Sequence, residues 1–303
     1  MSEPNPHPAF RHCGDFVPLS GFSGALVGML IPHGGIRRVR KASATPEDSA
    51  KLRSQAKRQQ HMSKLLAGVA AVPEILNEGS AEGCYWFDME YVVGTDAVRY
   101  LEQGSSERVK NLFGQIAAIL DTHASVSPDA GPTIRLAEVM ARKLDEIDAR
   151  TGALHHAATD LIRARLPDVS VDLAPNFAHG DLTLENILVD RRQRLWLIDT
   201  IDSPFDHYWI DMAKLFQDIE GRWFQRRGRS LSLGVTWTMR QRLMRHAVER
   251  DARYEQAHPV LLAITFARIL PYCQTDADRN FVLGKLLASL RHGHDASRTK
   301  EIS

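Results

Sequence analysis

The sequence predicts an α+β fold in which a small antiparallel sheet precedes a mainly helical region. Residues 16–94 consist of short apolar runs separated by turn signals, which is the pattern of strands and hairpins. From residue 95 onward the apolar residues recur every three or four positions, which is typical of amphipathic helices. We therefore expect an N-terminal lobe at residues 1–93 and a helical C-terminal lobe at residues 94–303.

The N-terminal region is expected to contain several strands, with one helix after the third strand. The helix follows Thr45-Pro46-Glu47-Asp48. Thr45 can cap it, Pro46 suits its first turn, and the acidic side chains favour the positive end of the helix dipole. The first ten residues are expected to form a loose tail. The expected strands are 16–19, 25–31, 36–41, 75–77 and 84–92.

One non-helical segment, residues 177–204, interrupts the helices of the C-terminal region. It contains two short apolar runs, 186–189 and 195–198, which predict a hairpin around the polar turn 190–193. The surrounding helices are expected at 106–126, 133–149, 154–166 and from 211 to about 291.

The composition argues against several classes of protein. Basic and acidic residues nearly balance, 38 against 37, so the chain lacks the positive charge of a typical nucleic-acid-binding domain. Cys13, Cys84 and Cys273 lie far apart, which argues against a disulfide framework or a thiolate zinc site and favours a reducing compartment. No apolar run approaches the length of a membrane span, and the N-terminus does not read as a signal peptide. We therefore expect a cytoplasmic protein that binds no nucleic acid and does not span a membrane.

The non-helical segment carries the residues that suggest chemistry. It reads His179-Gly-Asp181-Leu-Thr-Leu-Glu-Asn186, followed by the predicted hairpin and then by Asp199. Because Asn186 opens the first strand and Asp199 follows the second, both should lie at the same end of the hairpin, with Asp181 in the turn before it. Two carboxylates and an amide oxygen suit a Mg²⁺ ion that is shared with phosphate oxygens. One carboxylate could stay free to orient a hydroxyl group and accept its proton.

These residues resemble the aminoglycoside phosphotransferase and choline kinase-like family, which has a two-lobed protein-kinase-like fold. The resemblance rests on His-Gly-Asp181, on Asn186 five residues later, and on the hairpin that ends in Ile-Asp199. It implies an ATP- and Mg²⁺-dependent phosphotransferase that phosphorylates a hydroxyl group of a small molecule. In that family Asp181 would be the catalytic base, and Asn186 and Asp199 would be the metal ligands. Asp211, on a later helix, would brace the catalytic loop.

The N-terminal lobe agrees with this resemblance. Lys41 ends the third expected strand, where the family has its phosphate-binding lysine. Glu90 and Val92 match the hinge, whose backbone groups would bind adenine. The nucleotide is expected to be ATP, and GTP stays open. Backbone groups of the turn between the first two strands would cover the phosphates, namely Ser20, Gly21, Ser23 and Gly24.

One position departs from the family pattern. The helix after Lys41 has Gln55 where the family usually has a glutamate that pairs with the lysine. The sequence leaves two interpretations: Lys41 is held more loosely, or another acid such as Asp199 compensates. A non-catalytic kinase-like regulatory module therefore stays open as an alternative function.

The acceptor is the part of the function that the sequence defines least. The segments around Asp181, Asp199 and Asp211 also resemble a subgroup encoded with bacterial surface-polysaccharide genes, which implies a sugar or an envelope-polysaccharide precursor. The candidate acceptor contacts are Asp202, His207, Arg268 and Tyr272.

Two other acceptors stay open at this point. An aminoglycoside is a polycation that Asp202, Asp206 and Asp218 could bind, although the many arginines of residues 222–253 argue against it. A protein or a lipid is the other alternative, with those arginines as a docking surface. The sequence does not define the oligomeric state.

Overall fold

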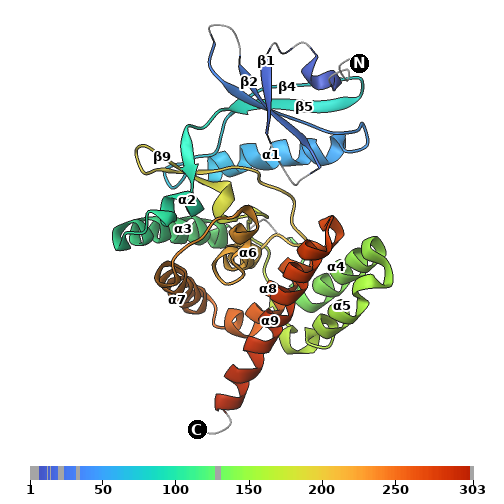
Figure 1. Ribbon diagram of the computed structural model, residues 1–303, viewed down its shortest axis with the longest axis vertical. Coiled ribbons are helices and arrows are strands. Elements are labelled where there is room, and N and C mark those ends of the chain that lie inside the picture. Colours follow the sequence, from blue (N-terminus) through green and yellow to red (C-terminus); the bar gives the residue numbers. More distant parts are fainter. Residues whose placement is uncertain are drawn as a thin grey trace. The chain divides into compact units, whose positions relative to one another are not determined.

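The computed structural model divides the chain into two compact units, whose elements are labelled in Figure 1. Unit 1 comprises Met1–Thr95 and Ile187–Asp202, and unit 2 comprises Asp96–Asn186 and Ser203–Ser303. The sequence analysis assigned residues 187–202 to the helical part, whereas their contacts group them with unit 1. The structure describes residues 7–11, 13, 15–19, 24–31, 35–126 and 131–300, without the side chains of 153 and 292–300.

A five-stranded antiparallel sheet is the centre of unit 1. Its strands lie in the order β1-β2-β3-β5-β4, so β3 is central. In this register Lys41 of β3 lies between Val27 of β2 and Phe87 of β5. All the predicted strands of the N-terminal region are present, with shifted ends. They are β1 (Asp15–Leu19), β2 (Leu26–Ile31), β3 (Arg38–Ala42), β4 (Ile75–Ala81) and β5 (Cys84–Glu90).

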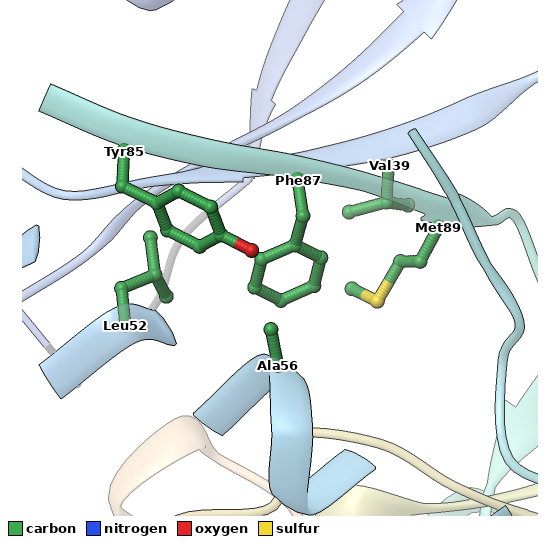
Figure 2. Close-up of a cluster of buried hydrophobic side chains, with 6 residues drawn as sticks. All are labelled: Val39, Leu52, Ala56, Tyr85, Phe87 and Met89. Atoms are coloured by element: carbon green, nitrogen blue, oxygen red, sulfur yellow. The ribbon is translucent and has the colours of Figure 1, made fainter. Parts of the chain in front are cut away.

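Helix α1 (Ser49–Leu65) covers one face of this sheet. Figure 2 shows the apolar contact, in which Leu52 and Ala56 of α1 meet side chains of β3 and β5. Val39 belongs to this cluster. Side chains two residues apart on a strand share a face, so Lys41 points to the same side of the sheet as α1. The cluster consists of Val39, Leu52, Ala56, Tyr85, Phe87 and Met89.

The opposite face of the sheet is covered by a segment that the sequence analysis treated as a loose tail. Pro8–Phe10 forms a short 3-10 helix, and Ala9 and Phe10 are buried. The Phe10 ring lies 4.9 Å from the Phe16 ring, measured between centroids. The expectation was therefore wrong for the described residues from His7 onward, because Phe10 completes the apolar packing on this face.

The predicted hairpin is also part of unit 1. It consists of β9 (Ile187–Asp190) and β10 (Leu195–Leu197), in a sheet ordered β10-β9-β6 with β6 (Gly94–Asp96). The backbone of Ala71 holds it, because Ala71 N–H donates to Leu195 at 2.8 Å and Leu197 N–H donates to Ala71 at 2.9 Å. These bonds explain why the hairpin groups with the N-terminal sheet.

Unit 2 is mainly helical. At its centre lie α6, all of whose residues are buried, and α8, most of whose residues are buried. Their rings pack together, with Trp209 of α6 lying 5.3 Å from Tyr254 of α8 between centroids. The helices are α2 (Ala97–Glu102), α3 (Ser106–Ser125), α4 (Leu136–Thr151), α5 (His156–Arg163), α6 (Trp209–Ile219), α7 (Leu233–Arg250), α8 (Arg253–Ala267) and α9 (Asp276–Lys300). Over the described part of the chain, none of the helices has the length and apolar character that a membrane span requires.

Candidate active site

Lys41 and Asp199 form an ion pair within unit 1. Lys41 is 4% exposed on the central strand β3, and its Nζ donates to Oδ1 of Asp199. Asp199 follows the hairpin strand β10 and has a left-handed backbone with φ of +61°. A residue other than glycine rarely adopts this conformation, and such strained positions cluster at functional sites. The structure thus brings together two residues that are 158 positions apart in the sequence.

Gln55 is neutral, so it cannot balance the charge of Lys41. It is buried on α1, and its Oε1 has no hydrogen-bond partner. The negative partner of Lys41 is Asp199. Of the two interpretations that the sequence left open, the structure therefore supports compensation by Asp199 over a loosely held lysine.

The other predicted nucleotide contacts lie in unit 1 as well. Glu90 ends β5, and its N–H is already used by the carbonyl oxygen of Glu74 at 3.1 Å. Val92 follows it and is partly exposed. Gly24 has a left-handed backbone with φ of +73°, as a tight turn requires. Three predicted contacts, Ser20, Gly21 and Ser23, lie outside the described residues.

In unit 2, Asp211 of α6 braces the loop that contains the candidate base. Its two carboxylate oxygens accept hydrogen bonds from the backbone N–H groups of His179 and Gly180, at 2.8 and 2.9 Å. Nδ1 of His123 lies 2.9 Å from the same carboxylate. Asp211 and His123 are fully buried. The bracing role that the resemblance implied for Asp211 is thus seen in its contacts.

Asp181 is held by two partners within unit 2. Its Oδ1 lies 2.8 Å from Nζ of Lys214, and its Oδ2 accepts a hydrogen bond from Nδ2 of Asn186 at 3.0 Å. Burial raises the pKa of Asp181, but the charge and hydrogen bond of Lys214 lower it, and the net pKa lies below the ordinary value. Asp181 is therefore an oriented carboxylate at neutral pH.

Asp218 supports the far end of the same loop. Its Oδ2 accepts the backbone N–H of Leu184 at 2.6 Å, and its Oδ1 is buried without a hydrogen-bond partner. Burial raises its pKa to about 7. As a fully buried side chain it is not available to bind a cationic acceptor, so its proposed place in an aminoglycoside site is wrong.

Asp211, Lys214 and Asp218 together form a polar stripe on the buried helix α6. They lie three and seven residues apart, which places them on one face of a helix. Each contacts a different part of the catalytic loop, in the order of the loop residues. The role of Lys214 is not predicted from the sequence, in which the spacing of Asp211, Lys214 and Asp218 inside an apolar helix is the one available signal.

The predicted acceptor contacts differ in their surroundings. Asp202 is exposed, and it ends the second segment of unit 1, Ile187–Asp202. His207 is buried, its Nδ1 accepts the N–H of Trp209 at 3.3 Å, and burial lowers its pKa to about 4. These contacts indicate that His207 has a structural role, and they do not support it as a contact of the acceptor.

Arg268 and Tyr272 lie together at the end of α8. Nη1 of Arg268 is buried and has no hydrogen-bond partner. Tyr272 is half exposed, and its hydroxyl accepts a hydrogen bond from Arg150 at 3.1 Å. Arg268 interacts electrostatically with both Asp181 and Tyr272. Of the predicted acceptor contacts, these two are the ones whose surroundings link them to Asp181.

The chemistry of the candidate metal ligands fits Mg²⁺. Both described side-chain hydrogen bonds of Asn186 are donated by Nδ2 to Asp181, which leaves its Oδ1 available. Asp199 supplies a partly exposed carboxylate. Over the described chain, no group of three or more His, Cys, Asp or Glu side chains could hold a metal ion. Phosphate and water oxygens would therefore have to complete the coordination, as is usual for Mg²⁺ in nucleotide enzymes.

The chain matches one protein-family model and is similar to several solved structures. The model of the phosphotransferase enzyme family matches residues 32–269. A search of the curated proteins finds no significant match. Among solved structures, the GDP and kanamycin complex of APH(2")-IIia is similar with a TM-score of 0.63 and 15% identity, over 94% of each chain.

Two further solved structures are similar over most of their length. The macrolide 2'-phosphotransferase type I has a TM-score of 0.59 and 18% identity, covering 90% of this chain and 91% of that one. The amicoumacin kinase hAmiN, in complex with AMP-PNP, Ca²⁺ and Ami, has a TM-score of 0.63 and 11% identity, covering 91% and 88%. At these identities the similarity concerns the fold, and it confirms the predicted α+β, protein-kinase-like class. Since the family model spans most of the chain, the protein belongs to the phosphotransferase enzyme family, and the predicted enzyme class, a small-molecule kinase with an alcohol group as acceptor, is confirmed.

Proposed function

We propose that this enzyme uses ATP and Mg²⁺ to phosphorylate a hydroxyl group of a sugar or an envelope-polysaccharide precursor in the cytoplasm. The main observation that supports this reaction is the environment of Asp181, whose carboxylate is held between Lys214 and Asn186. Similar folds bind GDP and AMP-PNP in APH(2")-IIia and in the amicoumacin kinase, which supports a nucleotide as donor. Neither neighbour defines the nucleotide or the acceptor of this protein.

Asp181 is the proposed base. Its pKa is below the ordinary value, so it accepts the hydroxyl proton late, as that proton becomes acidic during transfer. Phosphoryl transfer needs little covalent help, and positioning and electrostatics supply most of the rate. The acceptor oxygen forms a bond to the γ-phosphorus, the bond from that phosphorus to the β–γ bridging oxygen breaks, and ADP leaves with the electron pair. The hydroxyl proton goes to Asp181.

The nucleotide side of the proposal rests on Lys41, Asn186 and Asp199. Lys41 would bind phosphate oxygens, since its ammonium group lies on the central strand and is already positioned by Asp199. Asp199 and Oδ1 of Asn186 would hold Mg²⁺, which neutralises charge on the phosphates when bound. Backbone groups near Gly24, Glu90 and Val92 would bind the rest of the nucleotide, together with those of Ser20, Gly21 and Ser23.

Thermal unfolding with nucleotides tests the donor without knowledge of the acceptor. A ligand at about 100 times its dissociation constant adds about 2.7 kcal/mol to the free energy of unfolding. We expect ATP to stabilise the protein only with Mg²⁺, and GTP to do so more weakly. Asp199→Asn should abolish the Mg²⁺-dependent part, while Asp202→Asn, an exposed carboxylate nearby, should leave it intact.

Asp181→Asn tests the base. The variant should bind Mg²⁺ and ATP as the wild type does, and it should lose about a thousandfold in kcat, within the range that a general base contributes. Full turnover by this variant would remove Asp181 from the proposed reaction. Loss of nucleotide binding instead would assign it to the donor site.

A further inference from the structure

Two cations of unit 2 interact with the candidate base. Lys214 contacts Asp181 directly at 2.8 Å, and Arg268 interacts with it electrostatically. Two acids, Asp218 and Glu185, also interact with Asp181, and Glu185 is paired with Arg227 at 3.1 Å. The nearby acid Asp218 is fully buried and bonds Leu184, so it does not present a charge to a ligand.

Arg268 is a cation whose buried hydrogen-bonding group is not satisfied within unit 2. Its Nη1 is buried without a hydrogen-bond partner. Leaving such a donor unpaired costs about 1–3 kcal/mol, more when the group is charged. Three other arginines of unit 2 have carboxylate partners. Arg229 binds Asp96 at 2.8 Å, Arg226 binds Asp278, and Arg163 binds Asp148 at 2.8 Å.

Tyr272 extends this positive region to the surface. It follows Arg268 by one turn, and the guanidinium of Arg150 lies over its ring, 4.5 Å from the centroid. One acid, Glu146, interacts electrostatically with Arg268, but its carboxylate is exposed and already paired with Lys143. Tyr272 and Arg268 therefore offer a half-exposed aromatic ring and a guanidinium whose buried Nη1 lacks a hydrogen-bond partner.

We propose that the acceptor is an anionic small molecule, whose carboxylate or phosphate group binds Arg268 and whose ring or chain lies against Tyr272, with its hydroxyl group at Asp181. An oxyanion supplies the acceptor atoms that Nη1 lacks, and arginine binds carboxylates and phosphates with charge-assisted hydrogen bonds. A polycation such as an aminoglycoside would instead be repelled by Lys214 and Arg268. This inference rests on the proposed function, because it defines the acceptor of the same reaction.

Matched acceptors test the charge preference. Glucose, glucuronate, glucose 1-phosphate and kanamycin are each offered with Mg²⁺ and ATP, and ADP release and ³¹P NMR measure transfer. We expect at least one anionic sugar to exceed glucose in kcat/KM by about tenfold, which corresponds to about 1.4 kcal/mol. Glucuronate and glucose 1-phosphate distinguish a carboxylate from a phosphate as the bound group.

Variants of Arg268 then test its role. Arg268→Gln should lower kcat/KM for the preferred anionic sugar by about tenfold, mainly through KM, and should lower kcat/KM for glucose much less. Arg268→Lys should recover part of the loss, because it keeps the charge without the planar geometry. Arg135→Gln is the matched control, since Arg135 is an exposed arginine of unit 2 that pairs with Glu138.

If turnover is slow, saturation-transfer NMR with the same compounds measures whether the protein binds anionic sugars in preference to neutral ones. Preferential binding of an anionic sugar that is lost in Arg268→Gln supports the inference. Equal binding of neutral and anionic sugars, a preference for kanamycin, or no binding of either anion overturns it. Stabilisation by Mg²⁺ and ATP in the same samples shows that the nucleotide part of the proposed function stands even where the preference for an anionic acceptor fails. Without that stabilisation both proposals fail.

Discussion

The two units hold their candidate catalytic residues in different ways. In unit 1 the charge of Lys41 is balanced by one residue, Asp199, which also is a candidate metal ligand. In unit 2 the loop around Asp181 is held by a buried network from a single helix, α6, through Asp211, Lys214 and Asp218.

This difference indicates which part of the site is preformed. The contacts of the polar stripe are made by the protein with itself, so the base should keep its position whether or not ligands are present. The pair of Lys41 and Asp199 shares its carboxylate with a prospective cation, so its geometry should depend on the nucleotide and the metal. We therefore expect substitutions in the stripe to affect stability and substitutions in the pair to affect ligand binding.

The largest expected effect concerns Asp211. Asp211→Asn removes the charge that accepts two loop N–H groups and contacts the buried His123, so it should destabilise the protein by about 3–5 kcal/mol. Asp199→Asn should cost less than this, because the Asp199 carboxylate is partly exposed, although the buried Lys41 loses its partner. Urea unfolding measures both. Equal losses of stability in the two variants would contradict the idea that the loop around Asp181 is preformed while the pair of Lys41 and Asp199 depends on ligands.

The next effect concerns the pH dependence of stability. The pKa of Asp218 is raised to about 7 in the folded protein, so the folded state holds a proton that the unfolded state releases near its ordinary pKa of 3.8. Stability from this group is complete at low pH and is lost as the pH rises through about 7. The loss approaches about 1.4 kcal/mol per pH unit between the two pKa values, which gives about 2 kcal/mol from about pH 5 to about pH 7.

Asp218→Asn should remove this slope. The amide oxygen can still accept the N–H of Leu184, and the variant has no proton to release. Urea unfolding at several pH values compares the two proteins. Parallel pH profiles for the wild type and Asp218→Asn would show that Asp218 does not titrate in this window.

Lys214 gives a smaller effect, on activity. Lys214→Met removes the charge that lowers the pKa of Asp181, while burial continues to raise it, so the pKa of Asp181 should rise. The acidic limb of the pH profile of kcat/KM should then move to higher pH, and kcat should fall by about tenfold. Lys214→Arg should restore the limb. Lys143→Met, which removes a cation paired with Glu146, is the control and should leave the profile unchanged.

The sequence predicted the fold class and most of its elements, and it suggested some of the candidate site residues. Asp181, Asn186 and Asp199 could be recognised because their chemistry depends on short spacings and on a hairpin. Lys214 could not be recognised in the same way, because its partner lies 33 residues earlier and the helix around it reads as apolar core. Asp199 could only be suggested as the partner of Lys41, since no local pattern links a strand to a loop 158 residues later.

The smallest effect sharpens the comparison at Gln55. Gln55→Glu should give Lys41 a second carboxylate partner and release Asp199 for Mg²⁺, so the affinity for ATP with Mg²⁺ should rise by about threefold, or less than 1 kcal/mol. Stability should change by less than about 1 kcal/mol, because the new charge is paired.

Gln59→Glu is the matched control, one turn later on α1 and also buried. Its Nε2 donates to the carbonyl oxygen of Pro73 at 2.8 Å, so a carboxylate there loses that bond and faces a carbonyl oxygen. It should cost about 3 kcal/mol or more. If Gln55→Glu destabilises the protein as much as Gln59→Glu does, then Gln55 lies beyond the reach of Lys41, and Asp199 is its permanent partner.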